Sequence, residues 1–468
     1  MTDVGVSLSE HRLGQGALSA SRHGSRPGDH RPGRLDEFWP LTVYFYLFPV
    51  WWLMGLAHLM LFIVAVPMAW QLLAVRRLRV PQGFALFGLF LVWAVLGVTM
   101  LWVRVPGTQN NTGPSPLAGF AFHLLWYFSI TIAGLYVVNA SRRGLTARRV
   151  VRMLGFMFVV TVIGGYAGLL LPHLSFPSLI ELFLPAKMTN AEFFSALFHP
   201  RLALQTDILG YEAPRITAPY SYPNAWGNAF GVLLPFFVLA WFGKGSGWRR
   251  TAGVVVLAAS VVPVVYSLNR GLWVGIAISV VWVVVRRLCA GDLKVAVLTV
   301  VGVLVAVIAL SSTALGTAVA LRAQNGHSNG RRESTAAMAV QAAAQTSPLL
   351  GFGNTRQMLG NFASIAGGST PTCHQCAAPP LGTQGFLWGL IFTTGFVGAA
   401  LFLGFLGWHA ILNATRAGPL ALATSTTLIA GLFFFLFYDS LDVPMLVIFL
   451  GLCLAAREYS VDPEQVLT

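Results

Sequence analysis

The chain has 468 residues, of which 56% are hydrophobic and 10% are charged, and its mean hydropathy is +0.70. Soluble domains carry about 25% charged residues, so this composition excludes a soluble globular enzyme and a disordered chain. The formal net charge is +14. In so apolar a chain this charge bears on membrane orientation and does not indicate a nucleic-acid partner.

The first 38 residues are polar, basic and rich in Gly and Ser, and they contain no apolar segment. This composition predicts a disordered cytoplasmic tail over 1–38, without a cleavable signal peptide. We predict a polytopic membrane domain over 39–456 and a second cytoplasmic tail over 457–468.

Continuous apolar runs fill the predicted membrane domain. They cover roughly 42–54, 56–74, 83–103, 117–138, 151–171, 223–243, 251–267, 271–286, 294–313, 385–407, 419–437 and 441–456. At about 20 residues per spanning helix, they predict an all-α polytopic membrane protein with about twelve transmembrane helices. Two boundaries stay open. Pro49 and Gly55 either kink one helix or separate two, and residues 268–270 alone divide the seventh run from the eighth.

Clusters of basic residues give the predicted membrane domain an orientation. With a cytoplasmic N-terminus and about twelve spans, all of the clusters fall on the cytoplasmic side, as the positive-inside rule requires. The same topology places two long segments outside the membrane, 172–222 and 314–384, and we expect both to be partly helical and to lie against the membrane surface. The clusters are Arg76, Arg77 and Arg79, Arg142 and Arg143, Arg148 and Arg149, Arg249 and Arg250, Arg286 and Arg287, and Arg416.

Several cations nevertheless fall on the predicted external face, where few acids accompany them. They are Arg104, Lys187, Arg201, Arg215, Arg270, Arg322, Arg331, Arg332 and Arg356. Because a planar guanidinium binds phosphate through two hydrogen bonds, such arginines predict a diphosphate site at the outer membrane surface. We expect no metal and no cofactor, since the external segments contain no Asp-x-Asp motif.

Arg270 is the sharpest case among these cations. It lies between two apolar runs with almost no loop around it. Ionisable groups at membrane depth are costly and usually functional, so we assign Arg270 to the predicted site. The alternatives are that its side chain extends to the interface, or that it pairs with Asp439 or Asp442.

Two further places carry candidate site residues. Arg215 opens the segment before the apolar run at 223–243, and Asn224 is a candidate cap for that helix. Arg331 and Arg332 follow Asn-Gly in a polar loop. We assign a substrate role to one of these two arginines, although a pair of arginines is often only a solvated surface feature.

Other features of the sequence have structural interpretations. Residues 332–346 are rich in helix formers and predict a helix that Pro348 ends. His58 and His123 lie inside apolar runs, and we interpret them as histidines that hydrogen-bond within the helix bundle. The cysteine pair of residues 373–376 leaves open a local disulfide and a metal site.

Three segments resemble the bacterial O-antigen ligase and O-antigen polymerase superfamily, which are polytopic glycosyltransferases of the GT-C type. Residues 215–224 are similar to the family's Arg-x-x-Gly-x-Phe-x-Asn-Pro-Asn stretch. Residues 267–271 are similar to its Thr/Ser-x-Ser-Arg-Gly motif at the outer end of a span. Residues 330–353 are similar to Gly-Arg followed by Pro-Leu-Leu-Gly-x-Gly in its large external loop. The order and spacing of the three also agree with the family's topology.

The resemblance implies transfer of a glycan from a polyprenyl-diphosphate carrier to a glycan or glycolipid acceptor. The reaction would take place among membrane lipids, on the outer face of the bacterial inner (plasma) membrane. The resemblance also implies roles for single residues. The catalytic diphosphate ligands would be Arg215, Arg270 and Arg331. The substrate-binding residues would be Arg332, Asn224, Asn269 and Gln384.

One position departs from the family's pattern. Where the family has His-Asn after its large loop, this chain has Thr383 and Gln384. The family's histidine is thought to help activate the acceptor, so its replacement favours a polymerase or a divergent ligase in which Gln384 orients an acceptor hydroxyl. A transporter for lipid-linked oligosaccharides or small molecules is the alternative, but such proteins often show inverted repeats, and we find no internal duplication.

Overall fold

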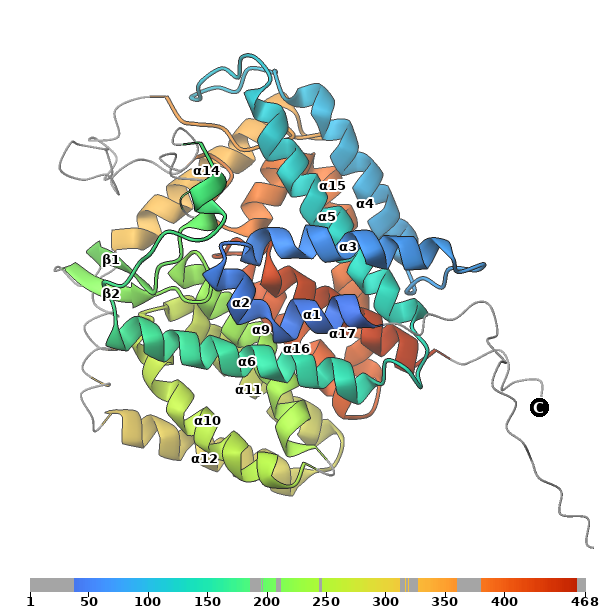
Figure 1. Cartoon of the computed structure of the whole chain (residues 1–468), viewed down its shortest axis with the longest axis vertical. Helices are drawn as coiled ribbons and strands as arrows, with labels where there is room; N and C mark the ends of the chain where they lie inside the picture. The colour runs from blue at the N-terminus through green and yellow to red at the C-terminus, as the bar shows by residue number, and fades with distance from the viewer. Residues whose placement is uncertain are drawn as a thin grey trace, which may run out of the picture.

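The computed structural model describes residues 38–185, 195, 197–207, 212–243, 246–311, 316, 319, 327–359 and 380–460. Most of these residues are helical (Figure 1). The predicted tail before Phe38 and the cysteine pair of residues 373–376 lie outside the described residues. The first elements are α1 (Trp39–Tyr46), α2 (Phe48–Leu53), α3 (Ala57–Leu73), α4 (Phe84–Leu96) with a 3-10 turn η1 (Gly97–Met100), α5 (Ser115–Asn139), α6 (Ala147–Leu170) and a second 3-10 turn η2 (Glu181–Phe183).

Six of the described helices are long and apolar enough to cross a membrane, and four shorter apolar helices accompany them. This confirms a mostly helical protein of the membrane type. Fewer of the described helices than the twelve predicted are long enough to cross a membrane, because several apolar runs form shorter helices. The remaining elements are β1 (Ala203–Asp207), β2 (Glu212–Ile216), α9 (Pro223–Phe242), α10 (Trp248–Tyr266), α11 (Arg270–Cys289), α12 (Leu293–Ser311), α14 (His327–Thr346), α15 (Phe386–Thr415), α16 (Pro419–Phe434) and α17 (Val443–Glu458).

The two boundaries that the sequence left open are both breaks in the structure. Run 42–54 divides into α1 and α2, and Gly55 then adopts a positive φ of 76° before α3 begins. A side chain at Gly55 would meet Ser178 and Ile180, so the turn is packed against residues 178–180. Residues 267–269 form the turn between α10 and α11.

The segment 172–222 adds one feature that the sequence did not predict in an otherwise mostly helical chain. Beyond η2, its described part contains the antiparallel pair β1–β2, with Leu204 opposite Arg215. Five-residue strands are too short to show a clear alternation in the sequence. The pair lies against α6, where a side chain at Gly164 would meet the carbonyl of Ala218 and one at Gly168 would meet that of Leu202. These two glycines therefore allow the hairpin and the segment after it to approach the helix closely.

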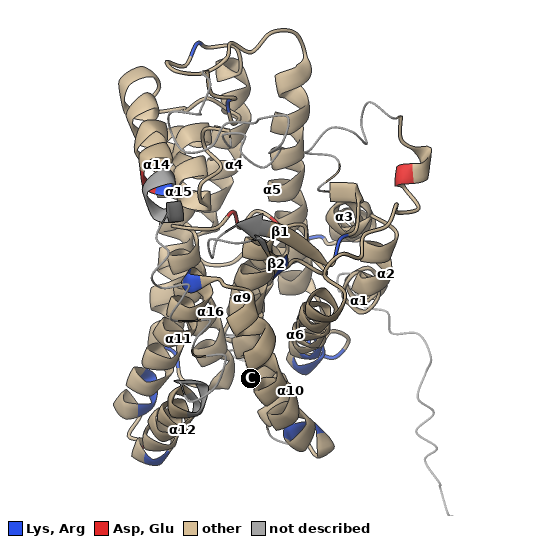
Figure 2. Ribbon diagram, turned by 90° about the vertical axis from the view of Figure 1, so that its left-hand side faces the viewer, with Lys and Arg blue, Asp and Glu red and all other residues tan. Residues whose placement is uncertain are grey.

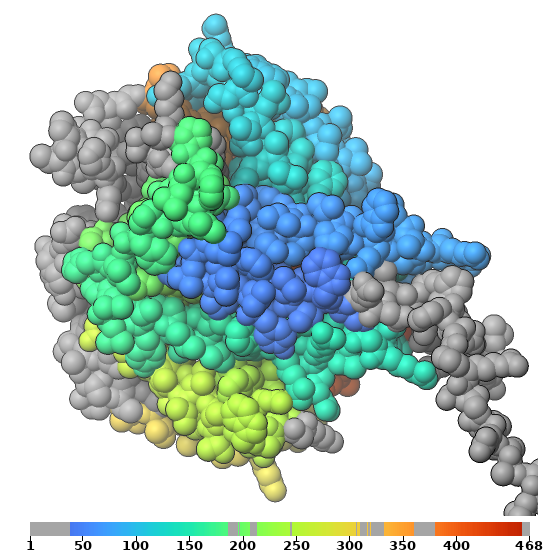
Figure 3. All heavy atoms as spheres, in the orientation of Figure 1, coloured from blue at the N-terminus to red at the C-terminus, as the bar shows by residue number. Residues whose placement is uncertain are grey.

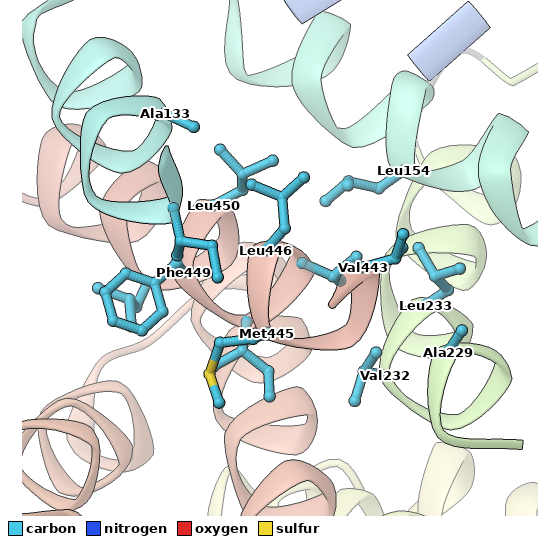
Figure 4. Packing of buried hydrophobic residues seen from close by; sticks show 14 of the residues in the cluster. Ala133, Leu154, Ala229, Val232, Leu233, Val443, Met445, Leu446, Phe449 and Leu450 are labelled. Carbon is cyan, nitrogen blue, oxygen red and sulfur yellow. The ribbon is translucent and has the colours of Figure 1, made fainter. Parts of the chain in front are cut away.

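The core is built around α17. Most of its side chains are buried, and the helix packs against α5, α9 and α16. Figure 4 shows Leu446 and Leu450 of α17 among Ala133 of α5, Leu154 of α6 and Leu233 of α9. A helix that is apolar on all sides belongs at the centre of a bundle. In Figure 3 the segments from α1 to α6 cover this centre almost completely.

The described elements separate into two ends. β1, β2 and α14 lie at the left of Figure 1, whereas α1 begins and α17 ends towards the right. Figure 2 looks onto the end that carries the strands and α14. The predicted helix at 332–346 is confirmed as part of α14, which ends at Thr346, two residues before Pro348.

A buried arginine fixes the segment that follows α14. Arg356 is 1% exposed and donates hydrogen bonds to the carbonyls of Met100, Leu101, Phe352, Asn354 and Thr355, at 2.8–3.3 Å. Burial lowers the pKa of Arg356 to about 10, so the guanidinium stays charged at neutral pH. Arg356 therefore belongs to the scaffold and is not one of the cations available to a ligand.

We expect replacement of Arg356 by Lys to lower the thermal midpoint of the detergent-solubilised protein, with a loss of about 2 kcal/mol, because an ammonium group cannot reach the same five carbonyls. The matched control is Arg104→Lys, since Arg104 is exposed. Equal midpoints for the two variants would show that the carbonyl contacts of Arg356 do not stabilise the fold.

Candidate functional site

The turn before α11 sets the position of Arg270. Leu268 in this turn has a positive φ of 52° although it is not glycine, which costs about 1–2 kcal/mol and requires firm packing around it. Asn269 is 4% exposed. Its side-chain nitrogen donates to the carbonyl of Pro223 at 3.4 Å, and its oxygen accepts a hydrogen bond from the Tyr438 hydroxyl. Arg270 is thus fixed between the start of α9 and the segment before α17.

Arg215 reaches the same turn from β2. Its Nε donates to the carbonyl of Ser267 at 3.3 Å, and its Nη2 donates to Oδ1 of Asn224 at 3.5 Å. The prediction that Asn224 caps α9 is wrong. The helix begins with Pro223 at its first position, which suits a residue without an N–H, and Asn224 lies inside the first turn. The side chain of Asn224 holds Arg215 instead.

Arg332 approaches from α14, which packs against α15. Its side chain is partly buried and lies in the electrostatic range of Tyr438 and Arg270. Burial lowers the pKa of Arg332, and the like charge of Arg270 lowers it further. Arg332 and Arg270 therefore lie close enough for their charges to act on each other.

Tyr438 lies within electrostatic reach of Arg332 and Arg215, and its hydroxyl hydrogen-bonds Asn269, the residue before Arg270. It is 1% exposed, and burial raises the pKa of its hydroxyl. The charges of Arg332 and Arg215 act in the opposite direction on that pKa, as does the hydrogen bond with Asn269. Tyr438 was not predicted from the sequence, although it opens a short polar run between two apolar ones. We call Arg215, Arg270 and Arg332, with Asn269 and Tyr438, the arginine cluster.

The remaining predicted residues fall near the cluster or outside the described side chains. Gln384 precedes Phe386 by two residues, and the N–H of Phe386 donates to the carbonyl of Tyr438 at 2.8 Å. The amide of Gln384 donates to the hydroxyl of Thr383 at 3.4 Å. The backbone of Arg331 belongs to α14, but its side chain lies outside the described part of the structure.

The arrangement has a simple chemical consequence. Three guanidinium groups come from a strand, a helix start and a separate helix, and all three are partly buried. Convergent cations in a partly buried place attract an anion, and the fork of each guanidinium fits phosphate oxygens. A scan against models of protein families finds no match to this chain, and a search of curated proteins finds no relative. The site therefore has to be interpreted from its own geometry.

Pyrophosphate should bind the arginine cluster and stabilise the protein. At about 100 times its dissociation constant it would add about 2.7 kcal/mol to the stability of the wild type. Arg332→Gln should reduce this gain, because one ligand is lost. The same substitution should raise the midpoint of the ligand-free protein, since the repulsion between Arg332 and Arg270 is removed. Thermal unfolding in detergent, with and without pyrophosphate, measures both effects.

The control for this measurement is Arg104→Gln, which changes an exposed arginine outside the cluster. It should keep the full response to pyrophosphate. An equal response from Arg332→Gln would exclude Arg332 from the anion site.

Proposed function

We propose that the protein is a membrane glycosyltransferase. It transfers a glycan from a polyprenyl-diphosphate carrier to a glycan or glycolipid acceptor on the outer face of the bacterial plasma membrane. The observation that carries this proposal is that Arg215 hydrogen-bonds the turn before Arg270, while Arg332 lies within electrostatic reach of Arg270 and Tyr438. All three arginines lie in segments whose sequences resemble O-antigen ligases and polymerases.

The chemistry needs cations at the leaving group. The acceptor oxygen forms a bond to the anomeric carbon, the bond from that carbon to the phosphate oxygen breaks, and the diphosphate keeps the electron pair. Negative charge therefore grows on the diphosphate in the transition state. Preorganised donors aimed at developing charge are usually the largest catalytic contribution. In this proposal Arg215 and Arg270 bind the diphosphate, Arg332 adds a third cation, and Asn269 and Tyr438 keep Arg270 in place.

The proposal includes a topology. If α1 and α2 together count as one crossing, the apolar helices would make twelve crossings, and both chain ends would lie in the cytoplasm. The position of α1 and α17 opposite β1, β2 and α14 supports this arrangement (Figure 1). The crossings would be α1 with α2, α3, α4, α5, α6, α9, α10, α11, α12, α15, α16 and α17.

The alternative is a transporter for the same lipid-linked glycan or for a small molecule. A transporter places its substrate site near the middle of the membrane, on broken helices. The described arginines of the cluster lie instead on a strand, at a helix start and on α14. β2 and α14 lie towards one end of the molecule (Figure 1). This placement suits chemistry at the membrane surface. Polymerase and ligase activities differ only in donor and acceptor, so the glycan left on the lipid carrier separates them.

Replacing Arg270 by Lys or Ala should lower transfer about 100-fold, because a point charge does not reproduce the fork of a guanidinium. We would express each variant and analyse the lipid-linked glycans in isolated membranes. Untransferred polyprenyl-diphosphate glycan should accumulate. Single repeat units in this pool indicate a polymerase, and full-length chains indicate a ligase.

Arg104→Lys is again the matched control, because Arg104 is a predicted external arginine that is exposed. It should leave the lipid-linked pool unchanged. Full transfer by Arg270→Lys at normal expression would exclude the bidentate role of Arg270. An unchanged pool in Arg270→Ala would favour the transporter.

A further inference from the structure

A second polar group lies close to the arginine cluster and has no part in it. Nδ1 of His58 lies 3.2 Å from a carboxylate oxygen of Asp442, and Nε2 of the same ring lies 2.7 Å from the hydroxyl oxygen of Ser221. His58 is the second residue of α3, Ser221 lies just before α9, and Asp442 lies just before α17. Three distant parts of the sequence thus form one hydrogen-bonded chain from hydroxyl to imidazole to carboxylate.

This geometry gives the imidazole a defined role. A carboxylate at Nδ1 fixes the tautomer in which Nε2 carries the free lone pair, and it stabilises the imidazolium that forms when Nε2 takes a proton. The Ser221 hydroxyl is then a donor to Nε2, and a hydroxyl oxygen can both donate and accept hydrogen bonds. The prediction that His58 hydrogen-bonds within the bundle is confirmed, but simple packing does not require this ordered chain.

A small pocket opens beside the chain. His58 and Ser221 line it together with Trp52, Tyr220, His199 and Arg201. It has room for about one water molecule or hydroxyl group. A hydroxyl in this pocket would lie next to Ser221.

The chain of contacts also lies close to the arginine cluster. Ser221 is three residues from Asn224, which binds Arg215, so their Cα atoms are at most about 11 Å apart. Asp442 is four residues from Tyr438, which limits that separation to about 14 Å. A donor held by its diphosphate on the arginines would have its sugar within reach of the pocket.

We propose that His58, Asp442 and Ser221 remove the proton from the acceptor hydroxyl, and that the pocket at Trp52 and Tyr220 receives this hydroxyl group. This inference rests on the proposed transferase function. The acceptor oxygen bonds to the anomeric carbon and gives its proton to the Ser221 oxygen, while Ser221 passes its own proton to Nε2 of His58. The diphosphate leaves with the electron pair, and the imidazolium, stabilised by Asp442, later releases its proton to solvent.

The test compares two acceptors in proteoliposomes that hold purified full-length protein and a synthetic polyprenyl-diphosphate glycan. The first is the hydroxyl acceptor, and the second is azide ion, which attacks without losing a proton. His58→Gln should lower transfer to the hydroxyl by about 10²–10⁴-fold, the usual contribution of general base catalysis. Formation of the glycosyl azide should stay within about twofold of the wild type, since attack by azide needs no general base.

Ser221→Ala and Asp442→Asn should follow the same pattern with smaller losses. His173→Gln is the matched control, because His173 is an exposed histidine of the external segment. It should leave both reactions unchanged. The pyrophosphate response of the His58 variant should equal that of the wild type, which shows that the arginine cluster is intact.

Each other outcome overturns the inference. If His58→Gln lost both reactions equally, His58 would have only a structural role. If it kept full transfer to the hydroxyl acceptor, His58 would have no role in the reaction. Labelling of Ser221 by a fluorophosphonate in the wild type would make Ser221 a nucleophile, as in serine hydrolases. A wild type that transfers to neither acceptor would refute the proposed function itself, which is a different result.

Discussion

Several guanidinium groups can be held close together only if the protein opposes their repulsion and their loss of water. In the described structure Tyr438 and Asn269, two buried groups that hydrogen-bond each other, hold the turn before Arg270 in place. The pKa of Arg332 is lowered by burial and by the charge of Arg270. A bound anion would stabilise these charges. The placement of the cations therefore both requires support from the protein and favours the binding of an anion.

The rest of the fold supplies the fixed points for this cluster. The buried helix α17 leads directly from the 438–442 segment, so the core holds Tyr438 and Asp442 in place. Glycines in α6 let the β1–β2 hairpin lie close enough to bring Arg215 to the start of α9. Arg356 ties the segment after α14 to the start of the loop before α5 through backbone carbonyls. None of these contacts touches a ligand, yet each fixes an element that carries a site residue.

Composition and apolar runs were sufficient to predict a helical protein with apolar helices, because long apolar runs without alternation fit helices that satisfy their own backbone hydrogen bonds. The arginines were found by their unusual place at the ends of apolar runs. The structure brings Arg215 to the turn before Arg270 and Arg332 within electrostatic reach of Arg270, whereas the side chain of Arg331, the third predicted diphosphate ligand, lies outside the described part. Tyr438 and the His58 chain were missed, because their partners are 163 or more residues away in sequence. The short strands and the contact between Arg215 and Asn224 could not be predicted from the sequence either, because both depend on tertiary packing.

The most direct test of glycosyl transfer at the arginine cluster is to reconstitute the purified protein with a synthetic polyprenyl-diphosphate glycan and an acceptor, and to follow the lipid. Transfer predicts that free polyprenyl diphosphate appears in step with a longer or newly attached glycan, and that Arg270→Ala abolishes both. Movement of the intact lipid-linked glycan to the other leaflet, without cleavage of its bond to phosphate, would contradict the enzyme and establish a transporter.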